Sequence, residues 1–258
     1  MSKYLICLKK EFTENLRTKK FFVLICVFAF FAMLSPFISR YMNEFLLMVL
    51  GQEDAAGLIQ IFPEPYWTDS YVQLYGNLTQ IGILTVMLLF MDAVLREKRR
   101  GTTDIVFTKG VSTATFILSK YTAAVSLSWA SLFIAVFITY FYTHLLFGYA
   151  GNIGNVLMGA FAFGILLSMM QALGLLASTI AKSTAMSAIT SFSFFLVVIL
   201  LSYIPRIGTW LPGGLMIGNM QLTLGNMYNE FAVNILLAVG VVIVALAISI
   251  RSLKKQEA

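Results

Sequence analysis

Residues 95–120 read LREKRRGTTDIVFTKGVSTATFILSK and separate two long apolar segments. The stretch begins with a cluster of bases, continues through Gly101-Thr102, and returns to charged residues at Lys109 and Lys120. A cluster of bases directly after an apolar segment is typical of a chain that stays on the cytoplasmic side of a membrane. The stretch therefore predicts a connection between two membrane spans.

The composition of the whole chain also indicates a membrane protein. Of its 258 residues 59% are hydrophobic, and the mean hydropathy is +0.84. A soluble domain contains about 45–50% apolar residues, and a small soluble protein could not bury such an excess. The net charge of +6 comes from bases that flank apolar segments, so we expect it to orient the chain in lipid and expect no nucleic-acid partner.

Six apolar segments are long enough to cross a hydrocarbon core of about 30 Å, which needs about 20 residues. They occupy roughly residues 21–38, 78–95, 121–141, 156–180, 185–204 and 231–250 of one transmembrane domain, residues 1–258. If the N-terminus is cytoplasmic, the cytoplasmic segments include residues 1–20 and 96–120, which contain six lysines and arginines each. Lys182 adds one and the C-terminal tail adds three, so 16 of the 18 lysines and arginines lie on the cytoplasmic side. The sequence thus predicts an all-α protein with both termini cytoplasmic.

The first 20 residues predict an amphipathic helix. At 100° per residue, an apolar stripe is formed by Tyr4, Leu5, Leu8, Phe12 and Leu16. Lys10, Glu14 and Arg17 lie opposite, while Asn15 intrudes on the stripe. We expect this helix to lie in the interface of the inner leaflet, with its cations near anionic lipid headgroups.

Two segments on the other side of the predicted membrane carry unusual patterns. Residues 205–230 are too apolar for a free loop and too rich in Gly and Pro for a span. They therefore predict a pair of re-entrant or interfacial short helices with a break at Gly213-Gly214. A loop packed on the outer surface is the alternative. Ser70 and Gln73 have capping-box spacing, which predicts a helix start near Ser70. Gln73, Asn77 and Gln80 would then share one face, toward a partner helix or an aqueous cavity.

The chain lacks the motifs of an enzyme or of an independent energy source. It has no phosphate-binding G-x-x-x-x-G-K-[ST] loop and no H-E-x-x-H, and its single histidine, His144, predicts no metal site. Asp92 is the only ionisable residue within the predicted spans, and Arg96 lies one turn away to neutralise it. We therefore expect a transport pathway that binds no cofactor or metal itself and is driven by another protein. A self-sufficient ion-coupled carrier or channel, which would act through Asp92, and a non-transporting scaffold are the alternatives.

The residues after the basic cluster predict a short helix between two breaks. Gly101-Thr102 ends the preceding helix, and Thr102 or Thr103 can cap a new one with Asp104 in its first turn. Its apolar face is formed by Ile105, Val106 and Phe107, Gly110 ends it, and Ser112 caps the next span. An apolar patch on such a helix requires either the membrane or a groove in a partner protein.

This segment resembles the cytoplasmic loop of ABC-2 type transporter permeases. The shared features are Glu97 before Gly101-Thr102, the turn at Val111-Ser112 and Lys120 in the following span, whereas Gly110 stands where the family commonly has Pro. The N-terminal sequence, with Lys10-Glu11-Phe12, Arg17 and Lys19-Lys20, is similar to the elbow helix of that family.

The resemblance implies a membrane subunit of an ATP-binding cassette exporter in the bacterial cytoplasmic membrane. It would pair with a second permease, identical or related, and with separate ATPase subunits that bind ATP and Mg²⁺. The implied ATPase-coupling residues are Glu97, Gly101, Thr102, Asp104, Ile105, Phe107, Val111 and Ser112. The pathway would be lined mainly by spans one, two and five, which indicates Gln73, Asn77, Gln80, Ser187, Thr190, Ser191 and Ser193. The alternative role of the serine and threonine residues is packing between helices. The expected cargo is a hydrophobic or amphipathic molecule, such as a lipid, a peptide antibiotic or a drug.

Overall fold

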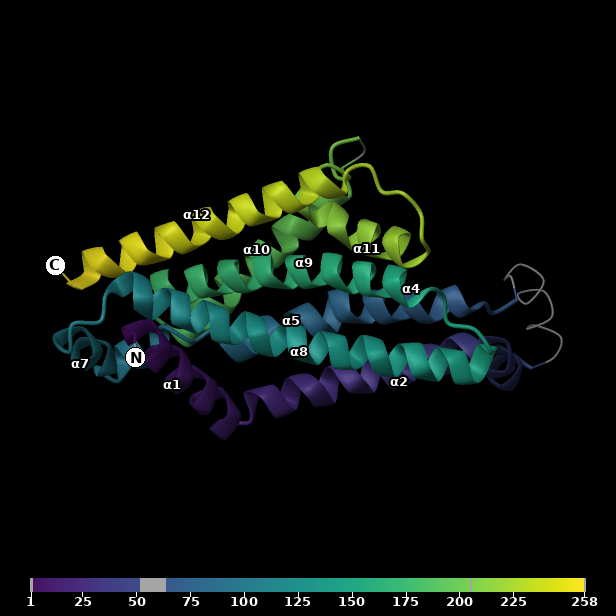
Figure 1. Cartoon of the computed structure of the whole chain (residues 1–258), viewed down its shortest axis with the longest axis horizontal. Coiled ribbons are helices and arrows are strands. Elements are labelled where there is room, and N and C mark those ends of the chain that lie inside the picture. Colours follow the sequence, from purple (N-terminus) through teal and green to yellow (C-terminus); the bar gives the residue numbers. More distant parts are fainter. Residues whose placement is uncertain (1, 52–63, 205, 258) are drawn as a thin grey trace.

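The computed structural model describes residues 2–51, 64–204 and 206–257, and these residues form helices and no strands. Six helical segments are long and apolar enough to cross a membrane, which confirms the predicted number. They are α2 (Lys20–Leu50), the run Trp67–Arg99, α8 (Thr113–Phe147), α9 (Ile153–Ile180), α10 (Thr184–Ser202) and α12 (Phe231–Glu257). Both termini lie at one end of the bundle, together with the short helix α7 (Thr102–Thr108) (Figure 1). We refer to this end as the terminal end.

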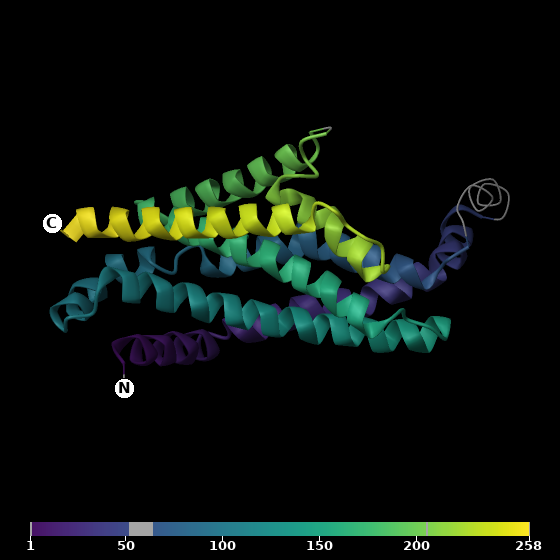
Figure 2. The same ribbon diagram turned by 45° about the horizontal axis from the view of Figure 1, so that its top comes forward.

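Helix α1 (Lys3–Arg17) turns sharply into α2 at Lys19, whose φ of 58° is left-handed. Figures 1 and 2 both show α1 beside the first turns of α8. The buried face of α1 carries Glu11 and Asn15, whereas Leu5 and Leu16 of the predicted apolar stripe are exposed. Lipid is as apolar as a leucine side chain, so only polar side chains gain from facing the protein here.

The second span consists of α4 (Trp67–Asn77), a π-helical turn η1 (Leu78–Gly82), α5 (Ile83–Phe90) and α6 (Leu95–Arg99). The prediction that this helix starts near Ser70 is wrong, because it starts at Trp67 and Asp69 accepts a 2.8 Å hydrogen bond from the backbone N–H of Tyr66. Ser70 is fully buried instead of serving as a cap.

The π turn divides the polar stripe predicted for this span. Asn77 Nδ2 donates to Ser35 Oγ of α2 at 3.2 Å. Gln80 instead lines a cavity together with residues of α10 and of α11 (Leu215–Thr223). The wider rings of a π turn rotate the residues after Asn77 relative to those before it, so the prediction of one shared face is wrong.

The segment before α12 contains one short α-helix, so the predicted pair is wrong; residue 205 lies outside the described residues. A 3₁₀ turn, Pro212–Gly214 (η2), leads directly into α11, and Gly213-Gly214 lies inside this turn. The segment is tied back by Asn234 Nδ2, which donates to the carbonyl oxygens of Thr209 and Leu211 at 2.9 and 2.7 Å.

Helix α9 forms the centre of the bundle and contacts α8, α10, α11 and α12. Its large apolar side chains are buried, including Phe163, Leu166 and Leu167. Helix α11 approaches α9 closely at Gly159, where a Cβ atom would lie 2.5 Å from the carbonyl oxygen of Asn219 and would also clash with Thr223 Oγ1. The absence of a side chain at Gly159 therefore sets the distance between these two helices.

We predict that Gly159→Ala destabilises the protein by about 1–3 kcal/mol, because α11 must move away from α9. Gly174→Ala is the matched control, since it lies on the same helix and a Cβ there meets nothing within 4 Å. Thermal unfolding of the two purified variants in detergent measures the difference. Equal unfolding temperatures would contradict the close packing of α9 and α11.

Candidate coupling site at the terminal end

A buried lysine joins three separate segments at the terminal end. Lys120 Nζ of α8 lies 2.6 Å from Glu97 Oε1 of α6 and 2.9 Å from Glu11 Oε1 of α1. The Lys120 side chain is only 3% exposed, and it lies over the Phe116 ring at 4.9 Å from the centroid. Since a buried charge requires compensation, these two ion pairs fix the positions of α1 and α6 relative to α8.

Lys10 completes the cluster from the solvent side. Its Nζ lies 2.5 Å from Glu97 Oε1, 3.3 Å from Glu11 Oε1 and 3.9 Å from Glu14 Oε2. Burial alone would lower the pKa of Lys10, but its hydrogen bond to Glu97 and the charge of Glu11 outweigh that effect and raise the pKa above its ordinary value. Lys10 therefore stays protonated at physiological pH.

The carboxylates in this cluster are balanced by the chain's own cations. One oxygen from each of Glu11, Glu14 and Glu97 lies within 4.8 Å of the others, a spacing that could hold a metal ion. The ammonium groups of Lys10 and Lys120 bind these same carboxylates. Within the described residues, the arrangement therefore suits a structural ion-pair network that needs no external cation.

A second ion-pair group lies next to the first. Arg96 Nη2 is 2.6 Å from Asp92 Oδ2, which confirms the predicted pair, and Lys20 Nζ lies 3.7 Å from Asp92 Oδ1. Asp92 thus ties the start of α2 to the end of the second span. Two cations hold its carboxylate, which fits a structural role for Asp92 better than a role in ion transport.

The short helix α7 has the predicted position, with one difference at its start. Gly101, with a left-handed φ of 66°, occupies the N-cap, so the prediction of a threonine cap is wrong. Thr102 Oγ1 donates to the carbonyl oxygen of Glu97 at 3.1 Å instead. Asp104 lies in the first turn and Gly110, with a φ of 72°, follows the helix. Ser112 caps α8 by accepting from the N–H of Thr115, as predicted.

The apolar residues of α7 face two directions. Phe107 packs edge-on against Phe116 at 5.5 Å between ring centroids, and Val106 joins the same buried cluster. Ile105 is not part of this cluster; it is 56% exposed, next to the exposed Asp104, and lies at the cleft between α1 and α7. Val111, in the turn before α8, is half-buried. The inner face of α7 thus attaches it to α8, and its outer face is free within the described residues.

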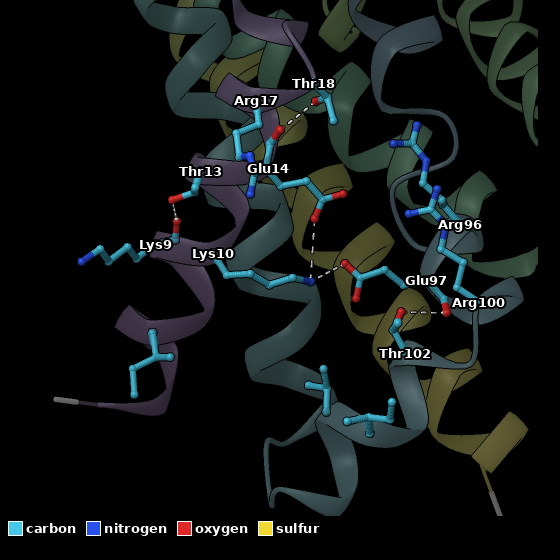
Figure 3. Close-up of a pocket in the computed structure, with 13 residues that line it drawn as sticks. Lys9, Lys10, Thr13, Glu14, Arg17, Thr18, Arg96, Glu97, Arg100 and Thr102 are labelled. Carbon is cyan, nitrogen blue, oxygen red and sulfur yellow. Dashed lines mark hydrogen bonds and ion pairs between the residues drawn. The ribbon is translucent and has the colours of Figure 1, made fainter.

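A cleft of about 750 Å³ separates α1 from α6 and α7. Figure 3 shows Lys9 and Arg17 on the α1 side and Arg96 and Arg100 on the other, with Lys10 bridging the middle to Glu97. The lining residues are Ile6, Lys9, Lys10, Thr13, Glu14, Arg17, Thr18, Arg96, Glu97, Arg100, Thr102, Ile105 and Val106. Basic residues outnumber acidic ones here, so the cleft favours acidic groups of a partner.

The predicted pathway residues do not form one group. Ser187 Oγ donates to the carbonyl oxygen of Met91, and the buried Ser191 lines an apolar cavity between α5 and α10. The hydroxyl groups of Thr190 and Ser193 donate to carbonyl oxygens of their own helix at 2.8 and 2.9 Å. Ser187 and Ser191 thus lie at the contact between α5 and α10, a position that fits helix packing.

Sequence reasoning named Glu97 and Lys120 but did not join them to α1. The signal was available in Glu11, a carboxylate beside the apolar stripe of an amphipathic helix, and in the adjacent Lys10. A helical wheel compares residues within one helix only, so it cannot show that Glu11 faces a buried lysine 109 positions later.

Comparison with known proteins identifies the family. A family model described as ABC-2 family transporter protein matches residues 5–208, from α1 to the residues just after α10. The chain belongs to the ABC-2 transporter family. This ABC-2 protein is also 24% identical, over 207 residues, to the uncharacterized transmembrane protein YxlG of Bacillus subtilis (strain 168), a match that covers 80% of this chain and 79% of that protein. The resemblance inferred from residues 95–120 is therefore confirmed, and the chain is a multi-pass membrane protein with a permease role.

We predict that Lys120→Met destabilises this ABC-2 protein by about 3–5 kcal/mol, because Glu11 and Glu97 are left facing each other without their buried cation. Lys109→Met removes an exposed lysine from the same region and is expected to change stability by less than about 0.5 kcal/mol. Unfolding of the purified variants in mixed detergent micelles measures both values. A small loss in Lys120→Met, equal to that of the control, would show that the network contributes little.

Proposed function

We propose that this chain is the permease subunit of an ATP-binding cassette exporter and that α7 is the helix that docks on the ATPase. The observation that carries the proposal is the free outer face of α7, where Ile105 is exposed on a helix flanked by Gly101 and Gly110. The outward isoleucine suits an apolar groove in a partner protein. Membership of the ABC-2 family supports this role, since permeases of that family typically work with an ATPase subunit.

The ion-pair network gives α7 a means of passing a movement into the membrane. Glu97 precedes α7 on α6 and Lys120 follows it on α8. Lys120 binds both Glu97 and Glu11 of α1, and Lys10 of α1 also binds Glu97. A force on α7 therefore acts on the second span, the third span and the N-terminal helix together. Gly101 and Gly110, both left-handed, are the points at which α7 can change its angle as this force is passed on.

The orientation that we propose places the terminal end in the cytoplasm of a bacterium, with both termini inside. The concentration of bases in residues 1–20 and 96–120 supports it. Helix α1 then acts as the elbow helix at the membrane interface, where its exposed Leu5, Ile6 and Leu16 meet lipid. ATP and Mg²⁺ are bound by the ATPase, and this chain holds neither.

A second permease, either another copy of this chain or a related one, completes the proposed transporter. The pathway between the two permeases exports a hydrophobic or amphipathic molecule such as a lipid, a peptide antibiotic or a drug. The largely apolar exposed surface of α10, with Ile189, Val197 and Leu200, suits contact with lipid, cargo or the second permease. The proposed lining of this pathway comprises residues of the second and fifth spans: Gln73, Asn77, Gln80, Ser187, Thr190, Ser191 and Ser193.

Ile105→Glu is predicted to reduce capture of the ATPase at least about tenfold, because a charge is placed where an apolar groove must close. The tagged full chain is purified from native membranes, and the co-purified ATPase and its ATP hydrolysis are measured. Ile207→Glu is the matched control, since Ile207 is also an isoleucine with 56% exposure and lies outside α7. Equal capture by the two variants would contradict docking through α7.

A glycine variant tests the coupling separately from docking. Gly101→Ala places a side chain at a φ of 66°, where it costs about 1 kcal/mol, although nothing lies within 4 Å to clash with it. We expect ATP hydrolysis to continue while transport per ATP falls several-fold. Gly148→Ala makes the same change at a φ of 74°, also without neighbours within 4 Å, at the far end of α8, and is expected to leave transport per ATP unchanged. Transport by the chain alone in liposomes without nucleotide would overturn the whole proposal in favour of a self-sufficient carrier.

A further inference from the structure

A cavity of about 410 Å³ is lined by residues of the second span, of α11 and of the end of α10. Helices α4 and α11 lie away from the terminal end of the bundle (Figure 1). Cavities of about 300–1,000 Å³ are typical of small-molecule sites. The lining side chains are mostly apolar, and among the described residues that line it none is a lysine, arginine, histidine or carboxylate. We refer to it as the α4–α11 cavity.

Asn219 of α11 is the unusual residue in this cavity. Its side chain is 0% exposed, and neither Oδ1 nor Nδ2 makes a hydrogen bond within the part of the chain that the structure describes. The Tyr75 hydroxyl, in the same lining, is also buried and makes no hydrogen bond there, although Thr223 lies close to it. Buried amides and hydroxyls almost always have a partner because leaving them unpaired is unfavourable. Two such groups in one cavity point to an additional molecule as their partner.

The π turn η1 contributes two further polar side chains. Thr79 and Gln80 lie within it and line the cavity, and Gln80 is exposed. A single π turn inside an α-helix is frequently found at a functional site. Tyr75 and Gly76, which precede the π turn, line the same cavity, whereas Asn77 is bound to Ser35 of α2.

We propose that the α4–α11 cavity binds a neutral amphipathic molecule. Its amide or hydroxyl group bonds to Asn219 and Tyr75, and its hydrocarbon lies against Ile199, Met216 and Met220. An amide side chain both donates and accepts, so it suits a neutral group of either type. A charged group is disfavoured because no lining residue in the described part of the chain carries an opposite charge.

Binding at this cavity is independent of ATPase docking. Only the identification of the ligand as cargo rests on the proposed function. The full chain in lipid nanodiscs, without any ATPase, therefore tests the site by itself. A site that binds with no transport would leave this inference intact while the proposed function fails.

The probe is decanamide with a photoreactive diazirine at the end of its chain, mapped by mass spectrometry of the labelled peptides. We expect labelling at residues 72–80, 199–203 and 213–220, and competition by unlabelled decanamide. Decyl sulfate and decyltrimethylammonium, of equal chain length, are expected to compete about tenfold less well. Equal competition by all three compounds would overturn the preference for a neutral group.

Asn219→Leu identifies the polar contact while keeping a similar volume in the cavity. We expect this variant to stay folded and to bind decanamide about five- to tenfold more weakly, the effect of losing one buried hydrogen bond. Asn226→Leu makes the same change at an exposed amide outside the cavity and is expected to bind like the wild type. Equal binding in Asn219→Leu and wild type, or labelling spread over lipid-facing helices, would show that water alone satisfies Asn219 and would overturn the proposal.

Discussion

The structure at the terminal end depends on one buried ammonium group. Lys120 lies away from solvent, and Glu97 and Glu11 both compensate its buried ammonium group. Three helices that are far apart in the sequence must therefore meet at one point. Helix α7 is connected at each end to a member of this network, so a displacement of α7 acts on the network from both sides, while Ile105 on α7 remains exposed among the described residues.

The second span connects the two candidate sites. Among the described residues, the run Trp67–Arg99 is the segment that contributes both to the cleft beside α1, through Glu97, and to the α4–α11 cavity, through Gln80. Its helix is continuous except at the π turn and at the turn before α6. A displacement of α6 could therefore reach the cavity along a single helical segment. The π turn lies where such a displacement would alter the cavity wall, because Thr79 and Gln80 of this turn line the cavity.

The features that were predictable from sequence depend on neighbouring residues. The six spans follow from the length of the apolar segments, and the Asp92–Arg96 pair follows from a spacing of one helical turn. The role of Ser112 follows from the ability of a serine hydroxyl to accept a hydrogen bond at the start of a helix. Two of the wrong predictions involve tertiary contacts. Ser70 has the right spacing for a cap but is buried against the bundle, and Gln80 leaves the predicted stripe because the π turn rotates it toward α10 and α11.

The sequence by itself thus determined that this chain is a six-span helical protein, because hydrophobic length and the charges at span ends depend only on local composition. Its likeness to the ABC-2 family came from the resemblance of residues 95–120 and of the N-terminal segment to that family. Only the tertiary structure decided which face of α1 contacts α8, that Lys10 and Glu11 join Glu97 and Lys120, and that Asn219 lies unpaired in a cavity. The physical reason is that lipid does not distinguish one apolar helix face from another. The choice of face therefore falls to a few polar side chains whose partners lie elsewhere in the chain.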